Sequence, residues 1–307
     1  MLESTRKWVV SMLVAVVCVL AASQVKAATV DLLVTSFFAQ VEQFNGTTGA
    51  HVGRFADGLF RPSSVIQGPG PNNYVFIGDQ EGVYRYEKED GTPLGLFSDT
   101  AARVVDIAFG PDGNMYTALA QGATSFIHKW DGSTGAHIGT FATLPFDSLQ
   151  SIMFGLTDGN LYASGGDFGV VKFDKTTGAN LGTFVGVLGS NGIAEGPDGH
   201  LYVVYAGDTP RIARYHGTTG AVLNDPYISL SSNPQRITFD AAGNLYVSKF
   251  SPNSVEKYNS AGAFQGVFAS GNGIDGAIDI AFFFPEPGVL TLLTLGLAGG
   301  LMRRSRS

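Results

Sequence analysis

The chain of 307 residues repeats itself at an interval of about 43 residues. Six aromatic residues mark the copies and lie 42 to 44 residues apart: Phe44, Tyr86, Trp130, Phe173, Tyr215 and Tyr258. Each is followed by a polar turn and then by a short segment that usually ends in Phe. The turns are rich in Asn, Asp and Gly, which suit β-hairpins because these residues accept positive φ and bond their own backbone.

A second motif recurs between these aromatic residues. One copy spans residues 107–116 and reads Ile-Ala-Phe-Gly-Pro-Asp-Gly-Asn-Met-Tyr, and others span 152–162, 193–202 and 237–246. Each copy predicts a strand, a tight turn and a second strand. The full repeat therefore contains four short strands, which is the content of one β-propeller blade.

The two ends of the array complete one another. The last copy begins with residues 277–282 and lacks the strand that should follow, whereas residues 31–37 align with residues 244–250 of the copy before it. We expect the N-terminal segment to complete the last blade and to close the ring. The predicted fold is all-β, a six-bladed propeller of four-stranded blades over residues 28–284. A linear β-solenoid is the alternative.

The repeats resemble NHL-type propellers and the related SMP-30/gluconolactonase-like and Vgb-like propellers. The similarity spans residues 30–283, but the motifs that carry it are structural. The Tyr-Val-Ala-Asp ending that is usual in NHL repeats is met only loosely, by Phe76-Ile77-Gly78-Asp79. The resemblance supports the fold and adds two alternative activities, a divalent-metal lactone hydrolase and a Vgb-like lyase.

Residues 1–27 predict a cleavable secretory signal peptide. Arg6 and Lys7 supply the positive start, residues 8–22 supply the apolar stretch, and small residues precede a cleavage site after Ala27. The apolar stretch is short for a membrane span, which favours cleavage over an uncleaved anchor.

Residues 285–307 predict a membrane-targeting tail. Pro285 and Pro287, on either side of Glu286, interrupt any strand or helix, and an apolar stretch follows. A helix from Pro287 to Met302 would be about 24 Å long, against a hydrocarbon core of about 30 Å. Basic residues at the very end, among them Arg303 and Arg304, favour the cytoplasmic side and can reach the headgroups.

This tail resembles the PEP-CTERM sorting signal of Gram-negative bacteria, with the Pro-Glu-Pro motif, the apolar helix and the basic end in order. The resemblance implies transient anchoring in the inner membrane and processing near the motif by a protease called exosortase. It also implies release to the cell surface or extracellular matrix and an association with exopolysaccharide. An ordinary C-terminal anchor is the alternative.

Composition excludes several functions. The net charge is −7, and the predicted propeller is more acidic than the whole chain because its ends carry basic residues. An acidic domain without a basic run repels phosphate backbones, which argues against nucleic acid as a partner. The single cysteine, Cys18, lies in the signal peptide, so the mature protein would have no disulfide or zinc–thiolate site.

No catalytic residues are predicted. The histidines fall in hairpin turns and outer strands, where they cannot converge on a triad or a three-His metal site: His51, His128, His137, His200 and His216. We expect them to be structural. Absence of enzymatic activity is favoured, and the question is left open.

Candidate ligand-binding residues come from loops expected on the top face, the face on which the innermost strand of each blade begins. They are Asp79, Glu81, Asp167, Tyr205, Asp208, Arg211 and Lys249. The four acids offer oxygen ligands suited to Ca²⁺, although ordinary solvated loop acids are the alternative and no cofactor is predicted. Tyr205, Phe168 and Phe250 would either stack on sugar rings or pack between blades.

The sequence thus predicts a non-enzymatic binding or structural protein of the cell envelope or matrix, which holds a polysaccharide or a protein by its top face. The last innermost strand ends on the opposite, bottom face, so a tail that leaves at Pro285 would point the top face away from the membrane. Convergent acids would favour the enzyme alternatives. A bare channel with an aromatic rim would favour binding.

Overall fold

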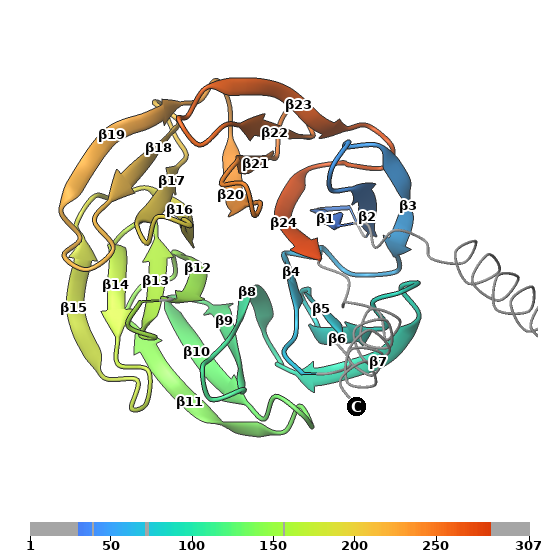
Figure 1. Cartoon of the computed structure of the whole chain (residues 1–307). Coiled ribbons are helices and arrows are strands. Elements are labelled where there is room, and N and C mark those ends of the chain that lie inside the picture. The colour runs from blue at the N-terminus through green and yellow to red at the C-terminus, as the bar shows by residue number, and fades with distance from the viewer. Residues whose placement is uncertain (1–29, 39, 71–73, 156, 284–307) are drawn as a thin grey trace, which may run out of the picture. The chain divides into compact units, whose positions relative to one another are not determined.

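The computed structural model describes residues 30–38, 40–70, 74–155 and 157–283, and these residues form twenty-four β-strands without a helix. The strands make six four-stranded antiparallel sheets that surround a central axis as the blades of a propeller (Figure 1). The predicted fold is therefore confirmed. In the described part of the chain no helix has the length and apolar character to span a membrane. The predicted signal peptide and sorting tail lie outside it.

The blades follow one another along the chain and are numbered here from the first complete sheet. Blade 1 is β4 (Ser64–Gln67), β5 (Val75–Gly78), β6 (Gly82–Tyr86) and β7 (Pro93–Asp99). Blade 2 is β8 (Arg103–Phe109), β9 (Met115–Gln121), β10 (Thr124–Trp130) and β11 (His137–Leu144). Blade 3 is β12 (Leu149–Phe154), β13 (Leu161–Gly165), β14 (Gly169–Phe173) and β15 (Asn180–Val185).

Blades 4 and 5 repeat this order, and blade 6 joins the two ends of the chain. Blade 4 is β16 (Ser190–Glu195), β17 (Leu201–Tyr205), β18 (Arg211–Tyr215) and β19 (Val222–Ser229). Blade 5 is β20 (Pro234–Phe239), β21 (Leu245–Lys249), β22 (Ser254–Tyr258) and β23 (Phe264–Ser270). Blade 6 is β24 (Ala277–Phe283), β1 (Asp31–Ser36), β2 (Gln40–Asn45) and β3 (His51–Ala56).

Blade 6 closes the ring as predicted. Its sheet has the order β24-β1-β2-β3, so the innermost strand comes from one end of the propeller sequence and the other three from the other end. The backbone N–H of Phe37 donates to the carbonyl of Gly276 at 3.0 Å, and the N–H of Asp279 donates to Thr35 Oγ1 at 2.8 Å. Because the last sheet is shared, no blade presents an unpaired innermost strand.

The blades pack on one another through aromatic rings. Tyr116 of β9 lies edge-on to Phe141 of its own blade and to Phe154 of blade 3, with ring centroids 4.9 and 4.8 Å apart. Tyr246 of β21 repeats the arrangement with Phe268 and with Phe282 of blade 6, at 4.9 and 4.8 Å. Edge-to-face geometry is favourable for aromatic pairs, and the same tyrosine position recurs in blades 2 to 5, so one sequence pattern builds the packing of these four blades.

The connections define two faces. Loops between the second and third strands, and those that lead to the next blade, gather on the top face, where the innermost strands begin. Turns between the first and second strands, and between the third and fourth, gather on the bottom face. The two faces therefore carry different loops, and each can be considered separately as a binding surface.

A polar trio recurs on the bottom face of blades 2 to 5. An Asp in the first turn accepts a hydrogen bond from a Tyr hydroxyl on the second strand and pairs with a Lys or Arg on the third strand. The trios are Asp112–Tyr116–Lys129, Asp158–Tyr162–Lys172, Asp198–Tyr202–Arg214 and Asp240–Tyr246–Lys257, with Asp–cation distances of 2.7, 2.7, 2.6 and 4.0 Å. The Asp residues of these turns thus hold the strands of each hairpin together.

Candidate binding faces

Asp79 lies beside the top face, but its carboxylate is used by the backbone. It is 1% exposed and accepts hydrogen bonds from the N–H groups of Phe60, Glu81 and Gly82 at 2.9, 2.7 and 3.0 Å. These bonds hold the β5–β6 turn and the segment that leads into β4. These contacts indicate that Asp79 stabilises the turn.

The predicted pair Tyr205 and Arg211 is brought together at the top end of blade 4. The guanidinium of Arg211 lies 4.3 Å from the ring centroid of Tyr205 and pairs with Asp225 at 2.5 Å. The Tyr205 hydroxyl, buried with its ring, lies 2.8 Å from that of Tyr215. Asp225 lies inside the outer strand β19, which begins at Val222.

Lys249 is fully buried and forms part of the packing of blade 5. Its Nζ lies 2.8 Å from Glu256 Oε2 and donates to Ser231 Oγ at 3.4 Å. The hydroxyl of Tyr258 donates to the same Glu256 oxygen at 2.6 Å. The ammonium therefore has its partners in blade 5 and in the segment that leads into it.

The three remaining predicted acids are exposed and lie in loops of different blades. Glu81 accepts a hydrogen bond from Tyr84 at 3.3 Å, and Asp208 lies in the β17–β18 loop. Asp167 borders a groove of about 410 Å³ in which Phe146 and Phe168 stack with centroids 5.5 Å apart. Within the described ranges, no three His, Cys, Asp or Glu side chains gather closely enough to hold a metal ion.

The histidines do not meet on the axis. The rings of His200 and His216 lie 5.3 Å apart at bottom-face turns, and those of His128 and His137 lie 4.9 Å apart on the outer strands of blade 2. His51 on β3 contacts Glu42 at 2.8 Å. They do not form a catalytic arrangement with one another.

The innermost strands place six equivalent residues around the axis, each directly before an apolar residue. These are Ser64, Asp106, Ser151, Gly192, Arg236 and Asp279. Two of them link neighbouring blades. Asp106 accepts from Ser64 of blade 1 at 3.0 Å and from Ser151 of blade 3 at 2.7 Å, and Asp279 accepts from the N–H of Val65 at 2.9 Å.

Arg236 crosses the ring from blade 5. Its Nη2 donates to the carbonyl of Val105 in blade 2 at 3.5 Å and to that of Gln150 in blade 3. The residue is 6% exposed, and its Nε has no hydrogen-bond partner. The guanidinium therefore ties together blades on opposite sides of the axis.

Two further arginines lie at the top end of the same ring. Arg61 and Arg103 each stand three residues before the ring position of their strands, in blades 1 and 2. Burial lowers the pKa of Arg103, and the positive charges of Arg236 and Arg61 lower it further, as expected for guanidinium groups that approach one another. Neither arginine was among the predicted site residues.

An aromatic cluster surrounds Arg61, and we call this set the Phe–Arg rim: Phe37, Phe38, Phe60, Arg61 and Phe250. The Arg61 guanidinium lies 4.9 Å from the ring of Phe37 and 5.8 Å from that of Phe60. Phe37 lies edge-on to Phe38 at 5.2 Å and to Phe250 at 5.6 Å. Phe38 is 59% exposed and Phe60 is 53% exposed, so the rim presents aromatic surface to solvent.

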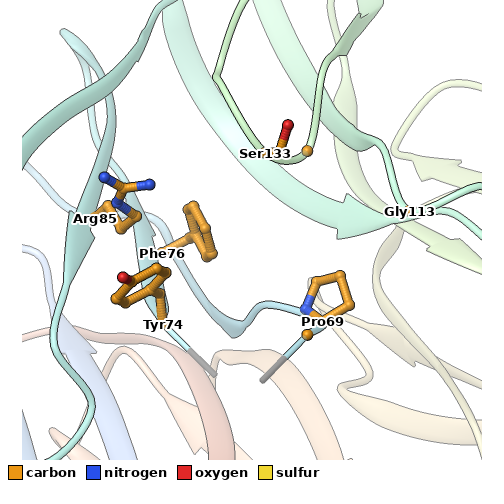
Figure 2. Close-up of a pocket in the computed structure, with 8 residues that line it drawn as sticks. Pro69, Tyr74, Phe76, Arg85, Gly113 and Ser133 are labelled. Carbon is orange, nitrogen blue, oxygen red and sulfur yellow. The ribbon is translucent and has the colours of Figure 1, made fainter. Parts of the chain in front are cut away.

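The bottom face has a cavity of about 460 Å³ between blades 1 and 2 (Figure 2). Arg85, Phe76 and Tyr74 of blade 1 line it, with Ser133 and Gly113 of blade 2. The sequence signal for this cavity is a departure from the repeat, because the first turn of blade 1 lacks the acid present in blades 2 to 5.

The fold is that of many solved propellers. A protein of unknown function from Bacteroides caccae aligns with a TM-score of 0.65 and 15% identity, over 83% of this chain and 99% of that one. A chain of the nidogen/laminin complex aligns at 0.64 and 15%, over 82% and 98%. A gluconolactonase from Xanthomonas campestris aligns at 0.54 and 16%, over 67% and 74%. No protein-family profile and no curated protein sequence matches the chain.

These comparisons define the class of protein. The chain is a six-bladed β-propeller with gluconolactonase-like structural neighbours. At such low identity the likeness concerns the fold, and function has to be argued from the residues of this chain.

Proposed function

We propose that the chain is an exported, non-enzymatic propeller of the cell surface or extracellular matrix, which binds polysaccharide through its top face. The Phe–Arg rim is the observation that carries the proposal. Phe60 lies beside the guanidinium of Arg61, Phe38 lies edge-on to Phe37 in the same cluster, and both expose more than half of their surface. Contiguous exposed apolar surface of this kind marks interaction sites.

The chemistry of the rim suits a sugar polymer. Aromatic rings offer flat apolar surface to the C–H faces of sugar rings, and guanidinium groups donate in a planar fork to hydroxyl or carboxylate oxygens. Arg103, which is exposed, extends the set of donors toward the axis. Phe146, stacked on the buried ring of Phe168, provides a second exposed aromatic side chain on the same face.

The first experiment compares two matched aromatic residues. Phe60→Ala removes a ring of the rim, whereas Phe264→Ala removes a ring of similar exposure, 56%, from the outer strand β23. The purified full-length protein is titrated with bacterial exopolysaccharides by calorimetry. We expect Phe60→Ala and Arg61→Ala to weaken binding about three- to tenfold and Phe264→Ala to leave it unchanged. Equal effects of Phe60→Ala and Phe264→Ala would contradict a top-face site.

The proposal includes the route to the surface. It comprises cleavage after Ala27, transient anchoring in the inner membrane with Arg303 and Arg304 at the cytoplasmic end, and processing by an exosortase-type protease at Pro285-Glu286-Pro287. Mass spectrometry of the released protein, from hosts with and without exosortase, tests it. We expect the new N-terminus after Ala27 in both hosts, because removal of a signal peptide does not require exosortase, and a new C-terminus near the Pro-Glu-Pro motif only in the exosortase host. Release of an intact C-terminus would contradict the sorting step.

A divalent-metal lactonase or a Vgb-like lyase is the second candidate, and likeness to a gluconolactonase is the observation that favours it. This candidate requires a bound metal ion, which the top-face acids Asp79, Glu81, Asp167 and Asp208 would have to supply with oxygen ligands. A metal at one hundred times its dissociation constant would stabilise the protein by about 2.7 kcal/mol. Stabilisation by Ca²⁺ that EDTA reverses would favour the enzyme, and lactone assays would follow.

A further inference from the structure

Blade 1 keeps the cation of the bottom-face trio but lacks its two partners. Arg85 on β6 occupies the position of Lys129, Lys172, Arg214 and Lys257 in the other trios. Gly70 stands where Asp112 stands in blade 2, and Phe76 stands where Tyr116 stands. Blade 1 has therefore lost both the carboxylate and the hydroxyl that meet the cation elsewhere.

Arg85 has no carboxylate partner in the described part of the chain. Its Nε is buried without a hydrogen-bond partner, and its guanidinium is held by rings, 4.8 Å from that of Tyr74 and 5.3 Å from that of Phe97. Residues 71–73 lie outside the described ranges, and their sequence, Pro-Asn-Asn, contains no acid. Arg85 is half-buried, so its charge is partly shielded from water without a compensating acid, and a bound anion would offset that part of the cost.

The space left by the missing partners is open. The cavity of about 460 Å³ falls in the size range of small-molecule sites and lies directly against Arg85, Tyr74 and Phe76 (Figure 2). Its opposite wall consists of Ser133 with the backbone of Gly113 and Gly132. The N–H and hydroxyl of Ser133 donate to Asp131, and the N–H groups of Gly113 and Gly132 also bond within the protein. The cavity thus combines one cation with flat apolar surfaces.

We infer that this bottom-face cavity is a binding site for a single organic carboxylate of monosaccharide size, whose carboxyl group takes the place of the missing Asp beside Arg85. The equivalent position in other blades of the same molecule shows that a carboxylate suits this cation. In blades 2 and 3 the cation lies 2.7 Å from a carboxylate. A planar guanidinium binds a carboxylate through two parallel hydrogen bonds. The site lies on the face opposite the Phe–Arg rim, so it does not depend on the proposed polysaccharide function.

The position of Phe76 allows a gain-of-function test. Its ring packs against Gly68, as the ring of Tyr116 packs against Gly110 and that of Tyr162 against Gly155. A hydroxyl added by Phe76→Tyr would therefore point where the tyrosines of blades 2 and 3 donate to Asp, at 3.0 and 2.9 Å. The variant restores the donor for a carboxylate that the ligand supplies.

The experiment uses the purified full-length chain and glucuronate as the probe, with glucose as its uncharged counterpart. We expect glucuronate to bind by calorimetry or NMR titration with a dissociation constant of about 1 mM or lower, and glucose to bind at least tenfold more weakly. Arg85→Gln should weaken glucuronate binding roughly ten- to hundredfold, and Arg85→Lys less. Phe76→Tyr should strengthen it about two- to tenfold.

Lys172→Gln is the matched control, because Lys172 holds the same position in blade 3 and is already paired with Asp158 at 2.7 Å. It should leave glucuronate binding unchanged. Circular dichroism of Arg85→Gln distinguishes loss of the site from loss of the fold, and Phe76→Tyr tests the site without removing a charge. The inference is wrong if glucuronate binds no better than glucose, or if Arg85→Gln and Lys172→Gln have the same effect on binding.

Discussion

Gly192 leaves open the space in which Arg236 begins its path across the ring. A Cβ on Gly192 would lie 3.0 Å from the Arg236 Cα, 3.1 Å from its Cδ and 2.6 Å from the carbonyl oxygen of Gln235. Both residues occupy the same position of their innermost strands, in blades 4 and 5. The smallest residue of the ring therefore accompanies the largest, and a bond between opposite blades depends on this pairing.

Gly192→Ala should destabilise the propeller by about 1 to 3 kcal/mol, because its Cβ would meet backbone rather than the end of a flexible side chain. Gly186→Ala is the control, since a Cβ there meets only the Thr183 Cγ2 at 3.9 Å. Urea unfolding of both variants measures the difference. Equal midpoints for the two variants would show that the ring tolerates a side chain at Gly192.

The burial of Asp279 leads us to expect an unusual pH dependence of the free energy of unfolding. Burial raises the pKa of this carboxyl to about 7, and the charge of Asp106 adds to the effect, while Arg236 and the N–H groups of Val65 and Ile280 oppose it. The folded-state pKa thus exceeds the unfolded value of 3.8, so between these values the folded state holds a proton that the unfolded state has lost. Its contribution to the free energy of unfolding falls as pH rises through this window, by up to about 1.4 kcal/mol per pH unit.

Asp279→Asn should abolish this slope. Its amide offers one oxygen where the carboxyl offers two, so one bond, to Val65 or Ile280, is lost at every pH. The quantity to plot is the difference in unfolding free energy between wild type and variant from pH 4 to pH 7.5. We expect the penalty of the variant to shrink as pH rises. A difference that stays constant would show that Asp279 is ionised throughout.

Much of the fold can be predicted from local patterns in the sequence. The repeat interval indicates the length of a blade, the hairpin turns indicate where its strands end, and the complementary ends indicate closure of the ring. The shared sheet of β24 and β1 confirms the predicted closure. These features depend on turn chemistry and on alternation of side chains, both of which act over a few residues. The ring could therefore be predicted without knowledge of any contact between blades.

The candidate sites were harder to predict, because they depend on which charges find partners. Lys249 and Asp79 were predicted from their place in top-face loops, but the first pairs with Glu256 and the second accepts backbone N–H groups. Arg236 lies on an innermost strand and reaches the carbonyl of Val105, 131 residues earlier in the chain. Such long-range contacts leave no local pattern. The missing acid of blade 1 is the exception, since alignment of the repeats reveals it.

Asp112 provides a test of the bottom-face trio. Although burial opposes the shift, hydrogen bonds from Lys129, Asn114 and Tyr116 lower the pKa of its carboxyl to about 2. Asp112→Ala should reduce the free energy of unfolding by about 1 to 2 kcal/mol at neutral pH, chiefly through the lost hydrogen bonds. Because the folded-state pKa lies below 3.8, this stabilisation is present above about pH 4 and is lost as pH falls toward 2.

The control for this variant is Asp208→Ala, in the exposed β17–β18 loop, which should change the free energy of unfolding by less than about 0.5 kcal/mol. Urea unfolding at pH 7 and at pH 3 measures both variants. If the loss of unfolding free energy caused by Asp112→Ala grows as the pH is lowered, the ionised carboxylate of Asp112 is not the source of the stabilisation.

Substitution of Lys249 tests whether this residue has a structural role or a ligand-binding one. Its ammonium is fully buried against Glu256, so Lys249→Met should leave a buried carboxylate without a compensating cation and cost about 3 to 5 kcal/mol. The double variant Lys249→Met, Glu256→Gln should recover most of that loss, because it removes both charges and keeps an oxygen that can accept from Tyr258. Thermal and urea unfolding of the single and double variants form the mutant cycle. If the double variant is no more stable than Lys249→Met, the cost lies in packing rather than in the unpaired charge, and the ion pair does not hold β21 and β22 together.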